Sequence, residues 1–195
     1  MKCDPVRHHR RSIRLTEHDY TQPGAYFVTM CTNSWVCLFG ELADGAVSLN
    51  AFGEIVADEW LRTALVRDNV SLDAFVIMPN HVHGIIIITQ EPTVRRGDPP
   101  GRPYMPKRLH GPASGSIGAI ISQFKARSTK RINMLRRTAG ARLWQRNYYE
   151  RVVRDEGELN EIRQYIVNNP AAWHTDEHNP SRDTSGQAPR VALNR

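Results

Sequence analysis

The sequence predicts an α+β fold of the ferredoxin-like type: a βαββαβ sandwich with an antiparallel sheet, helices on one face, and an added C-terminal helix. The first observation is the order of segments, because strand-like runs and helical periodicities follow one another as strand, helix, strand, strand, helix, strand, helix. The second is the length of 195 residues, which allows one domain with a substantial core. The third is the connection between the two middle strands, which is a tight turn and therefore predicts antiparallel pairing.

The N-terminal half predicts one strand, a small hairpin and one helix. Residues 23–32, PGAYFVTMCT, are rich in β-branched and aromatic residues and predict the strand. Two short apolar runs around Asp44-Gly45, a favoured turn pair, predict the hairpin. Asn50 is a suitable N-cap for a helix over residues 51–66. Its apolar positions at helical spacing are Phe52, Ile55, Val56 and Trp60.

The middle of the chain predicts two paired strands. Residues 70–78 form the first strand, Pro79 and Asn80 turn the chain, and residues 81–89 return as the partner strand. The isoleucine run in the second of these strands predicts burial on both faces, which is typical of a central strand.

The C-terminal half predicts a long connection followed by a helix and a strand. Residues 91–115 are rich in Pro, Gly and Arg and are expected to form a long mobile loop. A helix then begins near Ser116, and residues 143–153 predict the last strand. The apolar face of that helix is formed by Ile117, Ile120, Ile121 and Phe124.

The sequence divides into an arm, a domain and a tail. Residues 1–22 are expected to be a basic arm, residues 23–173 the domain, and residues 174–195 a disordered tail because they are polar and contain proline. The domain ends with a helix: Asp155, with a glutamate three residues later, resembles a capping box, and Pro170 ends the helix.

Positive charge is concentrated in two regions of the chain, whose formal net charge is +6. Residues 1–14 contain five basic residues and one acidic residue, and residues 95–137 contain eleven basic residues and one acidic residue. This segregation favours a polyanionic partner, most simply nucleic acid. The alternative is a solvated basic face on an ordinary enzyme, since runs of charge are weakly specific.

Composition also indicates a compartment. No apolar run approaches the roughly 20 residues needed to span a bilayer, so no membrane partner is expected. Cys3, Cys31 and Cys37 are odd in number and lack the spacing of a metal site. They are therefore interpreted as reduced thiols of a cytoplasmic protein.

Two histidines begin the second middle strand, in the stretch MPNHVHGIIII. Because side chains alternate along a strand, His81 and His83 project to the same face, with Cα atoms about 7 Å apart. Two such imidazoles can converge on one cation. Imidazole suits Zn, Mn, Fe or Ni, whereas Mg²⁺ needs few protein ligands when phosphate oxygens complete its shell. The alternative is a histidine pair fixed by hydrogen bonds at a hairpin turn.

Two histidines do not close a metal site, and the final helix offers a third ligand. Tyr165 and Asn169 are four residues apart and therefore share one helix face. The amide oxygen of Asn169 is a suitable ligand, although Pro170 disfavours helical geometry at Asn169. Tyr165 would lie one turn away from the same ion; alternatively, it is a half-buried packing residue.

These residues resemble a known family. MPNHVHGIII is similar to the His-hydrophobic-His (HUH) motif of single-tyrosine transposases. The stretches FGEIVADEWL, GSIGAIISQFK, LWQRNYYERVVRDE and IRQYIVNNP resemble the REP-associated tyrosine transposases, which are relatives of the insertion-sequence transposases. The similarity spans residues 11–173.

The resemblance implies a ferredoxin-like fold and a metal-dependent endonuclease and strand transferase of DNA transposition and recombination. It implies that His81, His83 and Asn169 bind the metal, Mg²⁺ or Mn²⁺, and that Tyr165 is the nucleophile. The family cuts single-stranded DNA next to hairpins, and its REP-associated members are linked to repeated palindromes. The implied intermediate is a 5′-phosphotyrosine, and the implied state is a monomer or a homodimer.

Basic side chains are expected to contact DNA phosphates. They lie in the arm, on the polar face of the helix after Ser116, and near the last strand: Arg10, Arg11, Arg14, Lys125, Arg127, Lys130, Arg131 and Arg146. Trp144, Tyr148 and Tyr149 either stack on unpaired bases or pack in the core. The two tyrosines are also rivals of Tyr165 as nucleophile.

Two other functions fit parts of the sequence. A non-catalytic hairpin DNA- or RNA-binding protein derived from a transposase would keep the fold and form no covalent adduct. A histidine-motif nucleotide hydrolase would normally have a third alternating histidine, but the next position on the same face is Ile85.

Overall fold

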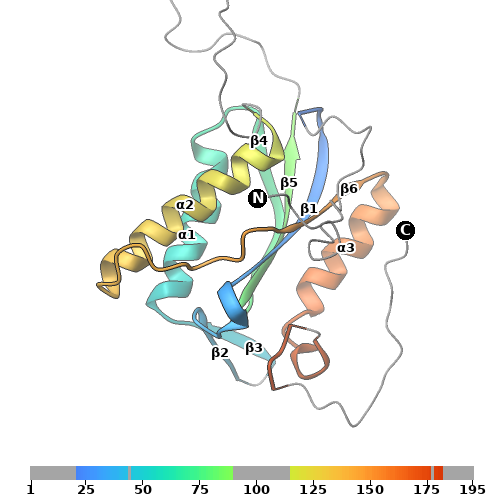
Figure 1. Ribbon diagram of the computed structural model, residues 1–195. Helices are drawn as coiled ribbons and strands as arrows, with labels where there is room; N and C mark the ends of the chain where they lie inside the picture. The colour runs from blue at the N-terminus through green and yellow to red at the C-terminus, as the bar shows by residue number, and fades with distance from the viewer. Residues whose placement is uncertain (1–20, 44, 90–114, 177, 182–195) are drawn as a thin grey trace, which may run out of the picture.

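The described part of the chain folds into a four-stranded sheet with three α-helices and a separate hairpin (Figure 1). The computed structural model describes residues 21–43, 45–89, 115–176 and 178–181. Nearly all of the expected arm and of the expected long loop lies outside these residues.

The sheet has the order β4-β5-β1-β6, and all neighbouring strands are antiparallel. Its strands are β1 (Gly24–Cys31), β4 (Val70–Ile77), β5 (His81–Ile88) and β6 (Tyr149–Val153). The first and third strands of the βαββαβ unit are therefore central, as in a ferredoxin-like sandwich. The predicted fold class is confirmed, and β5 is the central strand that its isoleucine run predicted.

Helices cover both faces of the sheet. They are α1 (Ala51–Leu65), α2 (Ile117–Leu135) and α3 (Glu156–Asn168). Figure 1 shows α1 and α2 on one side of the strands and α3 on the other. The side chains of β1 and β5 divide in the same way, because Val28 and Val82 belong to the core under α1 and α2, whereas Phe27 and Ile85 pack against α3. The added C-terminal helix therefore closes the face that α1 and α2 leave open.

The larger core lies between the sheet and the pair α1 and α2. Trp60 of α1 is fully buried there, with the rings of Phe124 and Phe75 at 5.5 and 6.0 Å. Gly84 of β5 makes room for this indole, since a Cβ at residue 84 would lie 2.3 Å from Trp60 Cζ2. A residue without a side chain is thus required where the central strand passes the largest core residue.

Side-chain caps begin each of the three helices. The side-chain oxygens of Asn50, Ser116 and Asp155 each accept hydrogen bonds from first-turn N–H groups of α1, α2 and α3. The predicted capping box is present in modified form, because the Glu158 carboxylate accepts from the N–H of Arg154 instead of the N–H of Asp155.

An ion pair attaches α3 to the edge strand β4. Arg163 Nε and Nη2 donate to the two carboxylate oxygens of Asp73 at 2.9 and 2.7 Å. The pairing of β4 with β5 shifts between Leu72 and Phe75, so Asp73 lies at a β-bulge. The irregularity in β4 and the arginine on α3 together fix the helix on this face of the sheet.

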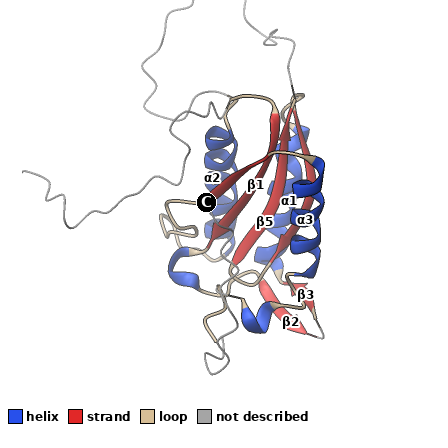
Figure 2. Ribbon diagram, turned by 90° about the vertical axis from the view of Figure 1, so that its right-hand side faces the viewer, coloured by secondary structure: helices blue, strands red, loops and turns tan. Residues whose placement is uncertain are grey.

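The last strand begins later than predicted. It starts at Tyr149 instead of residue 143, because Leu143 and Trp144 are core residues of the segment that precedes it. Trp144 forms only an isolated bridge with Thr32. The predicted hairpin is present as β2 (Gly40–Ala43) and β3 (Ala46–Leu49), a two-stranded sheet set apart at one end of the molecule (Figure 2).

The start of the expected tail is ordered against the domain. A 3₁₀-helix, η2 (Trp173–Thr175), follows α3, and Asn80 donates a hydrogen bond of 2.7 Å to the carbonyl oxygen of His178. Residues 174–176 and 178–181, which were assigned to the tail, thus include residues that contact the domain.

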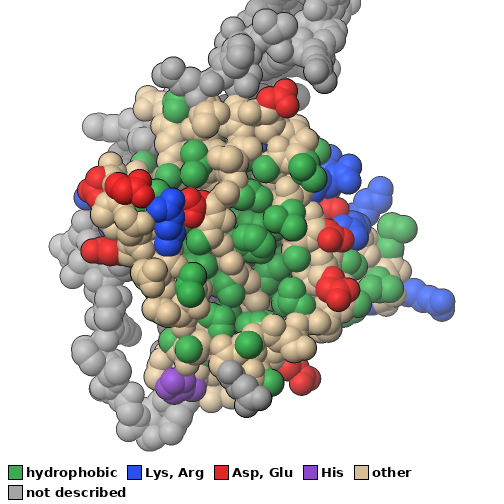
Figure 3. All heavy atoms as spheres, turned by 180° about the vertical axis from the view of Figure 1, so that it is seen from behind, with side chains coloured by type: hydrophobic (Ala, Val, Ile, Leu, Met, Phe, Trp, Pro, Cys, Tyr) green, Lys and Arg blue, Asp and Glu red, His purple; other side chains and the backbone are tan. Residues whose placement is uncertain are grey.

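The surface seen from behind is apolar at its centre (Figure 3). Acidic and basic side chains lie toward its two sides, so basic residues do not gather in the middle of this face. Within the described ranges, no helix combines the length and the apolar character that a membrane span needs.

Candidate active site

The two histidines of the MPNHVH stretch lie on the face of the sheet that α3 covers. His81 and His83 are 0% and 2% exposed, and their ring centroids are 4.5 Å apart. In the sheet they pair with Cys31 and Thr29 of β1. Strand alternation thus brings two buried imidazoles close enough to contact one cation, as predicted.

Hydrogen bonds orient both imidazoles. His81 Nδ1 lies 2.9 Å from Asn80 Oδ1, and His83 Nδ1 lies 2.8 Å from Thr29 Oγ1. The Asn80 amide is itself oriented, because its Nδ2 donates to the carbonyl oxygens of Trp35 and His178. Asn80 Oδ1 therefore accepts from His81 Nδ1–H, which leaves Nε2 of His81 unprotonated. Thr29 Oγ1 can fix the same tautomer of His83, with its lone pair on Nε2.

Burial keeps both imidazoles neutral. Desolvation, together with the nearby positive charge of His178, lowers the pKa of His83 to about 3. Desolvation also lowers the pKa of His81 to about 2, and the Asp176 carboxylate and the Asn169 side chain oppose this shift only partly. Neutral imidazole is the form that binds metals, so both side chains are ready to act as ligands at pH 7.

A carboxylate completes the cluster. One ligand atom each from His81, His83 and Asp176 lies within 4.8 Å of the others, and Asp176 Oδ2 is 3.9 Å from His81 Nε2. Burial raises the pKa of Asp176, but hydrogen bonds from His178 lower it more, so the pKa is below its ordinary value. Sequence reasoning missed Asp176 because it lies in WHTDEH, a polar stretch assigned to the tail. The available signal was an acid and a histidine two residues apart.

Asn169, the predicted third ligand, lies beside the same cluster. Its φ of −57° and ψ of −42° are helical, so Pro170 does not displace it from the end of α3. Asn169 Oδ1 and His81 Nε2 are both buried, and within the described residues neither atom has a hydrogen bond of good geometry, although the Asn169 side chain interacts with His81. Two buried acceptors without a donor are costly, and a cation bound between them would satisfy both.

Helix α3 brings Tyr165 to the histidines. Its Oη lies 3.3 Å from His83 Nε2, and the two rings are 5.2 Å apart. The Tyr165 ring also packs edge-on against Phe27 at 6.0 Å, so the packing expected of this residue is present together with the contact to His83. Tyr165 is 43% exposed, which leaves it accessible to a large substrate.

The other aromatic candidates have packing contacts. Trp144 is 7% exposed and donates from Nε1 to Ser128 Oγ at 2.9 Å, which favours the core alternative for this residue. Tyr149 packs edge-on against Phe27 at 6.1 Å. Tyr148 packs against the larger core and lies under the ammonium group of Lys125. Tyr165 shares the contact with Phe27 but in addition places its hydroxyl 3.3 Å from His83 Nε2.

Two of the predicted DNA-contacting residues make hydrogen bonds or ion pairs within the protein. Lys125 donates to the carbonyl oxygens of Gln145 and Asn147, both at 2.9 Å, and burial lowers its pKa to about 8. Arg131 forms ion pairs with the carboxylates of Asp58 and Glu59 on α1. Lys125 therefore anchors the segment before β6, and Arg131 joins α2 to α1.

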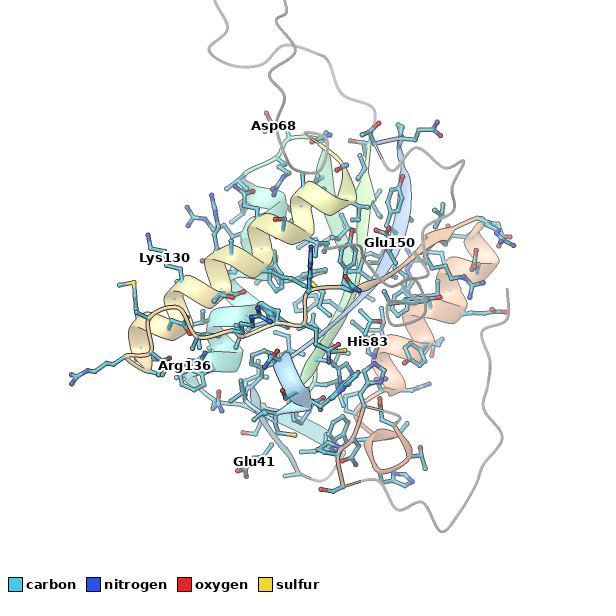
Figure 4. The ribbon with its side chains drawn as sticks, in the orientation of Figure 1. Glu41, Asp68, His83, Lys130, Arg136 and Glu150 are labelled. Carbon is cyan, nitrogen blue, oxygen red and sulfur yellow. The ribbon has the colours of Figure 1, made fainter. Side chains whose placement is uncertain are left out.

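Three more of the predicted basic residues lie in the described part of the chain. Lys130 and Arg146 are exposed, and Arg127 is half-buried. Figure 4 shows Lys130 on α2, on the opposite side of the sheet from His83. Arg10, Arg11 and Arg14 lie outside the described residues.

Comparisons with known proteins extend this description. No protein-family model matches the sequence. An uncharacterized protein of Haemophilus influenzae is 38% identical over 177 residues, which cover 87% of this chain and 93% of that protein. A solved REP-associated tyrosine transposase bound to a REP hairpin aligns with a TM-score of 0.54 at 16% identity. That alignment covers 82% of this chain and 73% of the other, and it shows a shared fold.

Proposed function

This chain belongs to the same family as the uncharacterized Haemophilus influenzae protein, and from that premise we propose a function. We propose that this chain is a metal-dependent, single-tyrosine DNA strand transferase of the HUH type. Its substrate is single-stranded DNA next to a hairpin, including REP-type palindromes, and its intermediate is a 5′-phosphotyrosine. The observation that carries this proposal is the Tyr165 hydroxyl, 3.3 Å from His83 Nε2 at the edge of the cluster of His81, His83 and Asp176.

The donor set suits a divalent cation. His81 and His83 offer neutral imidazole nitrogens, Asp176 a carboxylate, and Asn169 a buried amide oxygen. Mixed nitrogen and oxygen donors suit Mn²⁺, and they suit Mg²⁺ when phosphate oxygens complete its shell. Bound there, the cation would neutralise charge on the scissile phosphate and orient it for in-line attack.

Tyr165 supplies the nucleophile. Its Oη forms a bond to phosphorus while the bond from phosphorus to the 3′ oxygen breaks. The phenol proton goes to solvent, which reaches the side chain because it is 43% exposed, and the leaving 3′ oxygen takes a proton from water. The DNA 5′ end stays joined to the protein as a phosphodiester, so a second 3′-hydroxyl can reverse the step without a high-energy cofactor. Thr29 and Asn80 hold the imidazoles in place during both steps.

A hairpin DNA partner is supported by two independent features. The REP-associated tyrosine transposase that shares this fold was solved bound to a REP hairpin. This chain concentrates basic residues in its first 14 residues and in residues 95–137. We place the proposed phosphate contacts in these two regions and at Arg146, with Arg127, Lys130 and Arg146 as the surface contacts of the folded domain.

The test is incubation of the protein with 5′-labelled or 3′-labelled single-stranded hairpin DNA in Mg²⁺ or Mn²⁺, followed by a denaturing gel. The expected result is a protein–DNA adduct that carries the 3′ label, with release of a 5′-labelled fragment that ends in a 3′-hydroxyl. Tyr165→Phe should bind the hairpin but form no adduct, and His81→Ala should lose the adduct as well. Tyr148→Phe and Tyr149→Phe are the matched controls and should keep it.

An adduct that survives in Tyr165→Phe would move the nucleophile to another residue. Hairpin binding without an adduct, across varied DNA sequences and metals, would contradict catalysis. That result would support the alternative of a hairpin-binding protein derived from a transposase.

A further inference from the structure

We propose that the exposed indole of Trp35 forms a stacking platform for a nucleobase of the single-stranded DNA, next to the tyrosine and histidine cluster. This site rests on the proposed function, because it positions the same substrate. It assigns a binding role to a residue outside the helix and strands that carry the site.

The ring of His178 connects Trp35 to the histidine cluster. Its ring centroid lies 4.9 Å from that of His178, with the two planes nearly perpendicular at 84°. The His178 ring is in turn 4.7 Å from His81 and 6.0 Å from His83. A base stacked on Trp35 would therefore belong to a nucleotide beside the phosphate that the cluster handles.

The exposure of Trp35 is unusual among the tryptophans of the described chain. Trp60 and Trp144 are 0% and 7% exposed and belong to the core, and Trp173 is half-buried against His81. Trp35 is 40% exposed, and its neighbour Val36 is 49% exposed. A large apolar ring left open beside a site for a polyanion suits base stacking, because every nucleobase offers an apolar π-face.

The backbone holds Trp35 in a costly conformation. Ser34 and Trp35, in the 3₁₀-helix η1 (Asn33–Trp35), have positive φ values of 59° and 60°. For a bulky residue this region is rarely populated, and such strain persists only where the surroundings enforce it. Strained positions of this kind cluster at functional sites, which makes Trp35 a better candidate for a role than an ordinary exposed aromatic residue.

The same amide that orients His81 holds Trp35 in place. Asn80 Nδ2 donates to the Trp35 carbonyl oxygen at 3.0 Å, while Asn80 Oδ1 lies 2.9 Å from His81 Nδ1. The Trp35 N–H donates to the Thr32 carbonyl oxygen at 3.2 Å. The Trp35 backbone and the His81 imidazole are therefore fixed relative to one another through a single buried side chain. Such preorganisation lets a stacked base set the position of the neighbouring phosphate.

The test combines Trp35 variants with abasic scanning of the DNA. The probe is a fluorescent stem-loop with a single-stranded extension in which one position at a time is abasic. Trp35→Ala should weaken binding of the intact probe by about 5- to 150-fold, the range expected for loss of one stacked base. Trp35→Phe should keep most of the affinity. At one abasic position, wild type and Trp35→Ala should bind equally, because the partner base is already missing.

The control variant is Val36→Ala, which truncates the adjacent exposed side chain and should bind the probe as wild type does. Mn²⁺ affinity measured on Trp35→Ala should match wild type and so show that the histidine cluster is intact. A loss of affinity that is the same at every abasic position would assign Trp35 a structural role and overturn the site.

Failure of the site and failure of the proposed function give different results. If wild type forms the adduct and Trp35→Ala binds the probe equally well, the stacking site is wrong and the strand-transfer function stands. If wild type neither binds the stem-loop nor forms an adduct, both proposals are wrong.

Discussion

Thr29 and Asn80 decide which imidazole nitrogens face the donor cluster, although neither residue is itself a proposed ligand. Each contacts the Nδ1 atom of one histidine, at 2.8 and 2.9 Å. Because these contacts fix both the ring orientation and the tautomer, the affinity for a metal depends on them as well as on the ligands.

Thr29→Val tests this dependence with little change of shape. The valine removes the hydroxyl that contacts His83, so we expect Mn²⁺ affinity to fall by about 10- to 100-fold. Isothermal titration calorimetry on the purified protein measures the change. Thr129→Val is the matched control, because that hydroxyl bonds within α2 to the carbonyl oxygen of Lys125. Equal metal affinity in wild type and Thr29→Val would contradict a positioning role for Thr29.

The metal-free protein should lose stability in acid because of His83. Its pKa is about 3 in the folded protein and about 6.5 when unfolded, so the unfolded chain binds more protons between these values. The free energy of unfolding should therefore be greatest above pH 6.5 and fall as the pH drops toward 3. Urea unfolding in EDTA across this range measures the slope. His83→Gln should make the slope less steep without abolishing it, because the pKa of His81 is also lowered, whereas His174→Gln, which removes an exposed histidine, should leave it unchanged.

Local periodicity explains which site residues could be predicted. The shared direction of His81 and His83 follows from alternation along one strand, and the shared face of Tyr165 and Asn169 from the four-residue spacing of one helix. The roles of Tyr165 and Asn169 are implied by the family resemblance. Asp176 could not be predicted in this way. Its contact with His81 depends on how the chain returns to the sheet after α3, which is a long-range property of the fold.

At the scale of single elements, β5 requires glycine at residue 84. Gly84→Ala would place a Cβ against Trp60, which is fully buried and has no room to move away. We expect a loss of about 1–3 kcal/mol in the free energy of unfolding, measured by urea denaturation. Gly157→Ala in the first turn of α3 is the control and should change stability by less than about 1 kcal/mol.

The clash with Trp60 can be separated from a general effect of alanine in the strand. The double variant Gly84→Ala with Trp60→Phe should be less destabilised than the sum of its two single variants, because the smaller ring relieves the contact. Strict additivity would indicate that another contact of residue 84 causes the loss.

Helix α3 depends on Arg163 for its place on the sheet. Its hydrogen bonds to Asp73 lower the pKa of that carboxyl group, and they are the attachment of α3 to β4 described above. Arg163→Ala should speed hydrogen exchange in α3 and reduce adduct formation by Tyr165, while DNA affinity changes little. Arg154→Ala, an exposed arginine just before α3, is the control. Unchanged exchange in Arg163→Ala would show that apolar packing alone holds the helix.

The elements were predictable where local signals were strong. Capping residues and apolar spacing gave α1, α3 and the start of α2 to within a few residues, and the strand order follows from the βαββαβ pattern. The start of β6 was placed too early because Leu143 and Trp144 are apolar in either setting, and only tertiary packing assigns them to the core. The bulge at Asp73 likewise depends on pairing with β5.

At the scale of the whole molecule, the basic residues of α2 and the tyrosine site lie on opposite faces of the sheet. DNA that contacts both must pass around an edge of the sheet. Neutralising Lys130 should then weaken hairpin affinity without moving the position of cleavage.

Removal of residues 1–14 tests the contribution of the arm. This segment contains five basic residues, so we expect weaker hairpin binding and a salt dependence that is less steep by up to about 4 in the slope of log affinity against log salt. Fluorescence anisotropy over a salt series measures both quantities. If the truncated protein bound the hairpin as tightly as the full chain does, that result would contradict contacts between residues 1–14 and the DNA.

The segment after α3 connects the histidine cluster to the C-terminal part of the chain. Asp176 lies at the histidines and the His178 carbonyl oxygen accepts a hydrogen bond from Asn80, so the proposed uptake of an ion and the docking of these residues would form a single coupled equilibrium. A change that strengthens binding of the ion would therefore also strengthen docking of this segment, and the reverse would hold as well. A protease that trims the C-terminal end would thus report, by its speed, whether the site is filled.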